Sequence, residues 1–169
     1  SPEHRIYPYL LRDLTITRPN QVWSTDISYI PMQRGIMYLV AIVDWHSHFV
    51  ITWRLSNSLD GQFCLAALDD ALAQGRLDIF NTDQGVQFTA RIFPLRLEDA
   101  GVSISIDGRG RALVNVFIVR LWWSLKYEDI YCHDHATVPA LEVGLERYFT
   151  FYNYERPHQN LDYAVPGKV

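Results

Sequence analysis

Three strand-like runs follow one another closely in the first third of the chain. They are Val22–Ile30, Ile36–Val43 and Phe49–Leu55, and only short connections separate them. Such short connections favour antiparallel pairing, so the sequence predicts a three-stranded meander. The middle run is apolar throughout, which is typical of a strand covered on both faces. The chain must therefore fold around a sheet with a layer on each side.

The rest of the sequence alternates between strand and helix patterns. We expect a helix at about 60–74, a strand at 77–81, a helix at 88–100 kinked by Pro94, a strand at 102–106, and helices at about 113–127 and 138–153. Thr137 is the expected N-cap of the last helix, with Pro139 in its first turn. This order predicts an α/β fold with a mixed five-stranded sheet and flanking helices. We interpret residues 1–20 as an N-terminal arm and residues 21–169 as a single domain.

Charge and hydropathy exclude several classes of protein. The net charge is −4, so the chain is not a polybasic binder whose affinity depends on bulk charge. The longest apolar run has eight residues, too few to cross a bilayer, and no signal peptide is visible. Cys64 and Cys132 form neither a CxxC motif nor a disulfide framework. These features indicate a cytoplasmic protein with reduced thiols.

Two aspartates occupy positions from which they can converge. Asp26 lies within the first strand, and Asp83 directly follows the fourth. Taken singly, Asp26 fits a solvent-facing strand position and Asp83 an ordinary turn. Together, at strand ends where ligands bind in such sheets, they predict a site for Mg²⁺ or Mn²⁺.

The motifs around these aspartates resemble those of a known family. The matching segments are 22–30 (VWSTDISYI), 38–44 (YLVAIVD), 81–89 (NTDQGVQFT) and 151–161 (FYNYERPHQNL). They are similar to insertion-sequence transposases of the insertion-sequence-three type, whose integrase-like core belongs to the retroviral integrase superfamily, and the likeness runs from about Tyr7 to Pro166. It implies an RNase H-like fold, a magnesium- or manganese-binding triad of two aspartates and one glutamate, and DNA transposition and integration by metal-dependent phosphoryl transfer. It also implies transposon ends and target DNA as partners, and self-association. An upstream helix-turn-helix region is typical of such transposases, and we expect it to lie outside this chain.

The third member of the triad is replaced in this sequence. The resemblance places the glutamate thirty-five residues beyond Asp83, where the chain has Val119. The family pattern also has aspartate at 114 and arginine at 123, and the chain has Val114 and Trp123. We therefore expect an impaired or inactive copy. The alternative is a non-catalytic remnant that binds DNA or associates with its own kind. The C-terminal signature disfavours a third class, a stand-alone RNase H-type nuclease.

Helix periodicity separates Val119 from the expected core. At 100° per residue, an apolar stripe is formed by Val114, Phe117, Ile118, Leu121, Trp122 and Leu125. Val119 and Trp123 lie beside this stripe, although burial of Val119 at its edge remains the alternative. Glu128 is too far along the helix to replace the glutamate. Asp44 and Asp107 remain open as replacements, but the sequence gives no geometric reason for either.

Basic residues gather in the C-terminal half of the chain. The candidate nucleic-acid-binding set is Arg109, Arg111, Arg120, Lys126, Arg156 and His158. Scattered surface charge is the simpler interpretation, but a local phosphate-tracking surface fits the resemblance better. Such a protein would associate with the nucleoid when bound to DNA.

The run from Cys132 to His135 contains cysteine, histidine, aspartate and histidine in succession. Residues of these types are common metal ligands, but no second cluster has the usual ligand spacing. The pattern therefore favours a surface loop over a zinc site.

Overall fold

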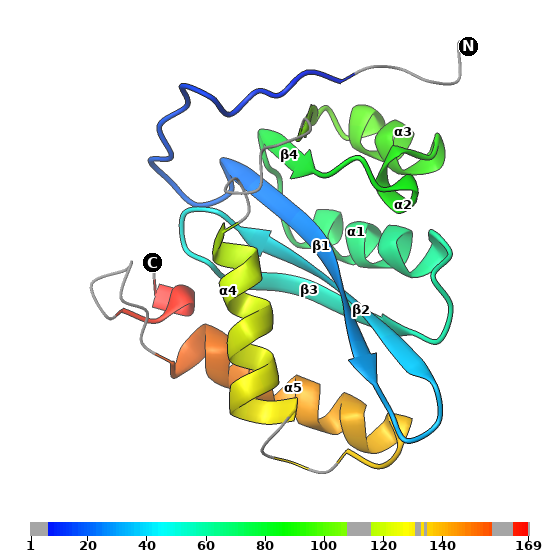
Figure 1. Cartoon of the computed structure of the whole chain (residues 1–169). Coiled ribbons are helices and arrows are strands. Elements are labelled where there is room, and N and C mark those ends of the chain that lie inside the picture. The colour runs from blue at the N-terminus through cyan, green and yellow to red at the C-terminus, as the bar shows by residue number, and fades with distance from the viewer. Residues whose placement is uncertain (1–6, 108–115, 131–132, 134, 157–163, 169) are drawn as a thin grey trace.

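A mixed five-stranded sheet forms the centre of the molecule (Figure 1). The computed structural model describes residues 7–107, 116–130, 133, 135–156 and 164–168. The strands are β1 (Val22–Pro31), β2 (Ile36–Asp44), β3 (Val50–Ser56), β4 (Ile79–Thr82) and β5 (Ser103–Ile106). Their order across the sheet is β3-β2-β1-β4-β5. The first three strands pair antiparallel and β4 and β5 join β1 in parallel, which confirms the predicted meander and mixed sheet.

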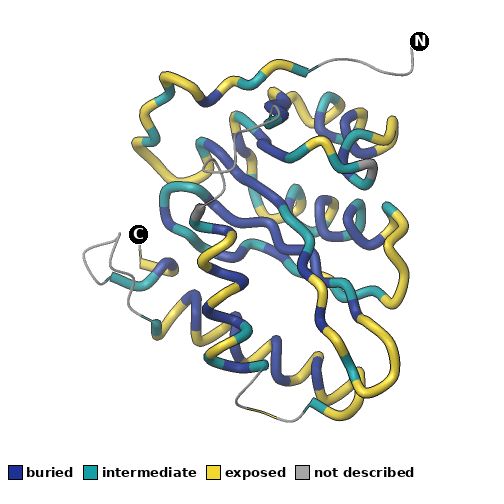
Figure 2. The backbone as a smooth tube through the Cα atoms, in the orientation of Figure 1, coloured by how far each residue is buried: buried dark blue, intermediate teal, exposed yellow. Residues whose placement is uncertain are grey.

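The inner strand β2, between β3 and β1, is buried on both faces, as its apolar sequence predicts. Leu39, Val40, Ala41 and Ile42 are at most 1% exposed. The hairpin from β1 turns at Gly35, whose φ of +87° lies in the left-handed region that favours glycine. Figure 2 shows the buried residues concentrated in the strands and in the inward sides of the helices.

One face of the sheet is covered by three helices, α1 (Gln62–Gln74), α2 (Val86–Thr89) and α3 (Ile92–Asp99). The prediction of one kinked helix over 88–100 is wrong, because α2 and α3 are separate. Pro94 lies in the first turn of α3, where the missing N–H of proline breaks no intrahelical hydrogen bond. The chain leaves α3 through Gly101, whose φ is +74°.

The other face is covered by α4 (Val116–Leu125) and α5 (Val138–Tyr154). A π-helical turn, η1 (Lys126–Ile130), follows α4 directly, and a short 3₁₀ turn, η3 (Pro166–Lys168), lies near the C-terminus. The predicted helix over 113–127 therefore ends at Leu125, and residues 113–115 fall outside the described part of the chain. The predicted N-cap of α5 is confirmed, since Thr137 Oγ1 accepts a hydrogen bond from the Ala140 N–H at 3.2 Å.

The first described residues of the N-terminal arm, 7–10, pack along β5. The Ile106 N–H donates to the Pro8 carbonyl at 3.2 Å, and the Leu10 N–H donates to Ser105 Oγ at 2.9 Å. The Tyr7 hydroxyl reaches Glu98 on α3 at 2.7 Å. Within the described residues, no helix combines the length and hydrophobicity needed to cross a bilayer.

Candidate metal and nucleic-acid site

Strand register brings three aspartates into one row. The residues that pair across the three parallel strands are Ser24, Asn81 and Ser105. Two residues further along each chain segment are Asp26, Asp83 and Asp107. Because successive strand residues alternate between faces, each aspartate lies on the same face as the polar residue two positions before it. We call Asp26, Asp83 and Asp107 the acidic row.

The acidic row lies on the face of the sheet that carries α4. The residues immediately before the three polar ones, Trp23, Phe80 and Ile104, belong to the core under α1 and α3, so the polar residues point to the opposite side. The helices α4 and α5 pack over β1, β2 and β3, and the core cluster on this face contains no described residue of β4 or β5. The acidic row therefore begins where the apolar covering layer ends, and its three side chains are only partly buried.

The row is electrostatically strained at Asp26. Burial raises the pKa of this carboxyl above its ordinary value, and the negative charges of Asp83 and Asp107 raise it further. The backbone N–H of Ile27 and the indole of Trp122 act in the opposite direction. The three carboxylates therefore lie near enough to influence one another's ionisation.

Each member of the row is held by a specific hydrogen bond. Trp122 Nε1, on α4, donates to Asp26 Oδ2 at 3.2 Å. Asp83 Oδ1 accepts from the Gly85 N–H at 2.7 Å, and Asp107 Oδ1 accepts from Asn81 Nδ2 at 3.1 Å. Asn81 is fully buried, and its Oδ1 has no hydrogen-bond partner among the described residues. An orphaned amide oxygen behind three carboxylates is a donor set that fits a hard, oxygen-seeking divalent cation.

Val119 lies at the edge of this site and outside the core. Its side chain is 56% exposed, so the alternative of a buried Val119 is wrong. The described members of the predicted stripe are buried, with Ile118, Leu121 and Leu125 at most 1% exposed. Val119 lies three residues before Trp122, whose indole reaches Asp26, so the two side chains are neighbours on the surface of α4.

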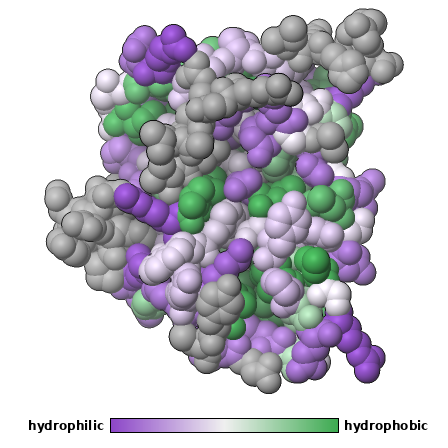
Figure 3. All heavy atoms as spheres, viewed as in Figure 1, coloured by the Kyte–Doolittle hydropathy of each residue, from purple (hydrophilic) through white to green (hydrophobic). Residues whose placement is uncertain are grey.

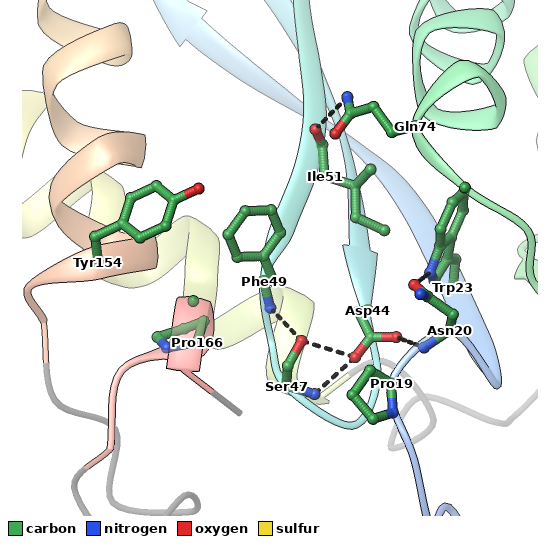
Figure 4. A pocket seen from close by; sticks show the side chains of 12 residues that line it. Pro19, Asn20, Trp23, Asp44, Ser47, Phe49, Ile51, Gln74, Tyr154 and Pro166 are labelled. Carbon is green, nitrogen blue, oxygen red and sulfur yellow. Dashed lines mark hydrogen bonds between the residues drawn. The ribbon is translucent and has the colours of Figure 1, made fainter.

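Asp44 has a structural role outside the acidic row. Figure 4 shows its carboxylate accepting hydrogen bonds from the Asn20 N–H and from both the N–H and the hydroxyl of Ser47, each at 2.7 Å. It is 2% exposed and fixes the turn between β2 and β3, beside a hollow of about 300 Å³ that reaches α1 and η3. Of the two replacements left open by the sequence, only Asp107 lies in the acidic row.

The candidate nucleic-acid-binding residues divide into three groups. Arg120 is exposed on α4, and Lys126 is partly exposed directly after it. Arg156 lies at the end of α5 and forms an ion pair with Glu128, with Nε 2.8 Å from Oε1. Arg109, Arg111 and His158 lie outside the described residues.

Exposed aromatic side chains accompany the cations of α4. Trp123 and Tyr127 are 59% and 54% exposed, and their ring centroids are 4.6 Å apart. Figure 3 shows hydrophobic side chains reaching the surface in the middle of the viewed face, while hydrophilic side chains dominate its margins. We call Val119, Arg120 and Trp123 the exposed face of α4, and Tyr127 continues it in η1.

Comparison with known proteins agrees with this geometry. A family model described as "Integrase core domain" matches residues 16–112, and a second model with the same description matches residues 100–166. The chain belongs to the integrase core family of insertion-sequence transposases. It is 30% identical over 155 residues to the transposase for insertion sequence element IS904 from Lactococcus lactis, covering 89% of this chain and 61% of the relative. It is also 30% identical over 149 residues to an uncharacterized transposase-like protein from Haemophilus influenzae, covering 87% of this chain and 69% of that protein.

Solved integrase structures share the fold. The HTLV-2 integrase catalytic core domain, in a trimeric form in complex with magnesium, aligns with a TM-score of 0.74 and 17% identity over 89% of this chain and 96% of that one. A chain of the simian T-cell lymphotropic virus intasome aligns with a TM-score of 0.74 and 20% identity over 94% of this integrase core and 56% of that chain. The predicted RNase H-like fold is thereby confirmed. This core spans 61% and 54% of the IS904 and IS629 transposases that it matches.

Proposed function

We propose that this chain is the catalytic core of an insertion-sequence transposase whose phosphoryl-transfer activity is impaired at position 119. The observation that supports the proposal most strongly is the exposed Val119, one turn from the tryptophan that contacts Asp26. The family resemblance expects a glutamate at this position, and the surrounding helix can accept one. The reaction class is cleavage and joining of DNA strands at transposon ends and target.

Asp26 and Asp83 are the residues that would hold Mg²⁺ or Mn²⁺. A bound divalent ion would neutralise charge on the reacting phosphate and lower the pKa of an attacking water. Trp122 orients the Asp26 carboxylate, and the Gly85 N–H fixes Asp83. Without a carboxylate from α4, the acidic row keeps only side chains from the sheet. A loss of about 4 kcal/mol in transition-state stabilisation slows the reaction roughly a thousandfold.

The DNA-binding part of the proposal rests on α4. Arg120 on α4 and Lys126 at the start of η1 are the described cations that would contact phosphates. Arg156 contributes less in this proposal, because Glu128 already neutralises its charge. Arg109, Arg111 and His158 remain sequence-based members of the set.

A nicking assay on supercoiled plasmid tests the proposal, because it needs no recognition of transposon ends. The comparison is between the wild type and a triple variant, Val114→Asp, Val119→Glu and Trp123→Arg, with Mn²⁺ present. We expect nicking from the triple variant only, and its loss when Asp83→Asn is added. Nicking by the wild type that disappears in Asp26→Asn would overturn the proposed impairment and would identify a working site.

The alternative function is a non-catalytic remnant that binds DNA or associates with its own kind. The exposed face of α4 favours it, since Val119 and Trp123 place apolar surface where the family pattern has charge. In the plasmid assay this function gives binding without nicking in the wild type and in the triple variant alike.

A further inference from the structure

A second cluster of metal-ligating side chains lies between η1 and the start of α5. Asp129 belongs to η1, and His133 and His135 follow it before α5 begins. Ligand atoms of the three residues all lie within 4.8 Å of one another. The cluster is at the end of α4 remote from Trp122, about 10 Å along the chain at 1.5 Å per helical residue. It is therefore separate from the acidic row.

The three ligand groups of this cluster lie within hydrogen-bonding distance of one another. Nε2 of His135 lies 2.9 Å from Oδ2 of Asp129, and Nδ1 of His133 lies 3.3 Å from Oδ1 and 3.1 Å from the backbone carbonyl oxygen of Asp129. Ligands about 2.0–2.2 Å from a tetrahedral zinc ion are about 3.3–3.6 Å apart. The two imidazoles approach different oxygens of one carboxylate, and a small outward shift of the rings would bring the ligand atoms to this spacing.

Burial distinguishes this carboxylate from an ordinary surface aspartate. Asp129 is 6% exposed, and within the described part of the chain its side-chain partners are the two imidazoles. A buried carboxylate is costly without a compensating positive charge. A divalent ion would supply that charge. His133, with a side chain 52% exposed, leaves the cluster open to solvent on one side.

Gly144 shows that the position of His135 is built into the fold. Glycine in a helix interior costs roughly 1 kcal/mol relative to alanine, yet Gly144 is in the middle of α5. A Cβ on this residue would collide with the His135 ring and lie 2.7 Å from its Nε2. The absence of a side chain at 144 therefore makes room for the imidazole against α5.

We propose that Asp129, His133 and His135 form a zinc site that joins η1 to the start of α5. Two imidazole nitrogens and one carboxylate oxygen are a donor set that zinc accepts readily, whereas Mg²⁺ prefers oxygen ligands alone. The fourth position is open to water or to another ligand. The sequence pattern favoured a surface loop here because the run from Cys132 to His135 has no second Cys/His cluster, whereas the fold brings Asp129 of the π-helical turn to the histidines.

Thermal unfolding and metal content of the intact chain test this site. After chelator treatment and dialysis, stoichiometric binding of one Zn²⁺ per chain is expected, with a rise in Tm of roughly 5–10 °C at a free zinc concentration about 100-fold above Kd. Mg²⁺ at the same concentration should not bind this cluster, so the Asp26→Asn/Asp83→Asn variant should show no rise in Tm with Mg²⁺. His133→Ala is the key variant, because the side chain is half exposed and its loss should not prevent folding.

Two further variants separate the possible outcomes. The Asp26→Asn/Asp83→Asn variant should keep the full zinc response, since it removes only ligands of the acidic row. Gly144→Ala should lose the response by displacing His135 while leaving Asp129 and His133 in place. An equal zinc response in His133→Ala and wild type, or no response in the wild type, would overturn the site and leave a metal-free hydrogen-bonded cluster. A response lost only in the Asp26→Asn/Asp83→Asn variant would assign the ion to the acidic row and equally overturn it.

Discussion

Val119 is a position where a charged side chain can be introduced without burying it. Substitutions at exposed positions usually change stability by no more than about 0.5 kcal/mol. Val119→Glu should therefore melt within about 2 °C of the wild type without metal. With Mn²⁺ the variant should gain clearly more stability than the wild type, because a new carboxylate joins Asp26 and Asp83. Differential scanning fluorimetry over a manganese titration measures both effects.

A matched control for this change is Ile92→Glu. Ile92 is 50% exposed on α3, across the sheet from the acidic row, so a glutamate there should leave the manganese response at the wild-type level. A large drop in Tm for Val119→Glu that Mn²⁺ does not restore would mean that position 119 is part of the core in solution.

Asp26 carries a pH dependence whose sign follows from its raised pKa. The folded state holds the Asp26 proton more tightly than the unfolded state does, so stability falls as pH rises from the ordinary value of 3.8 through the raised folded value. Above that window the ionised, partly buried carboxylate costs stability whenever no cation is bound. Asp26→Asn should therefore melt above the wild type at pH 7 in EDTA, and the difference should shrink as the pH approaches 4. An equal difference at both pH values would show that ionisation of Asp26 is not the cause.

At the scale of elements, the family motif at residues 151–161 attaches α5 to the sheet through Asn153. Asn153 is 6% exposed and bonds both backbone groups of Val50 on the edge strand β3. Its Oδ1 accepts from the Val50 N–H at 2.8 Å, and its Nδ2 donates to the Val50 carbonyl at 3.0 Å. Three residues later Arg156 pairs with Glu128 of η1. The segment that marks the family in sequence thus has a structural task in this fold.

Asn153→Ala tests this attachment. It leaves a buried N–H and a buried C=O of Val50 without partners, each worth about 1–3 kcal/mol, so a loss of about 2–4 kcal/mol in the free energy of unfolding is expected. Urea denaturation at pH 7 measures it, with Asn57→Ala, at an exposed loop position, as the control. A loss below about 0.5 kcal/mol would mean that water replaces the Asn153 amide and that α5 is held by its apolar side alone.

Sequence patterns predicted the sheet and two of the three aspartates for local reasons. The β-forming run around Asp26 and the turn after β4 are visible in a few consecutive residues, so Asp26 could be placed within one strand and Asp83 at the end of another. Asp107 could not, because its place beside Asp83 depends on the register between β4 and β5, which are joined through α2 and α3. The contact of Trp122 with Asp26 depends likewise on how α4 crosses the sheet. Features that depend on neighbouring residues of one element could be predicted from the sequence. Contacts between residues of different elements could be found only from the folded structure.

For the molecule as a whole, charge is distributed unevenly despite a net value of −4. Arg54 and Arg96 are paired with Asp70 and Asp69 of α1, on the face away from the acidic row. Among the described residues of α4, Arg120 is exposed with no recorded ion-pair partner. DNA should therefore bind on the α4 side of the molecule. There a few cations attract phosphates although the net charge of the chain is negative.

Binding to duplex DNA should accordingly be weak, independent of sequence and strongly reduced by salt. Each phosphate contact contributes about 0.9 to the slope of log K against log salt. Arg120→Ala should lower the magnitude of the slope by about 0.9, and Trp123→Arg should raise it by about 0.9, because both positions lie on the exposed face of α4. Arg96→Ala, on α3 and paired with Asp69, should leave both the affinity and the slope unchanged. Fluorescence anisotropy over a salt series gives all three values. A flat salt response in the wild type, or an Arg96→Ala variant that weakens binding as much as Arg120→Ala, would show that DNA does not bind through α4.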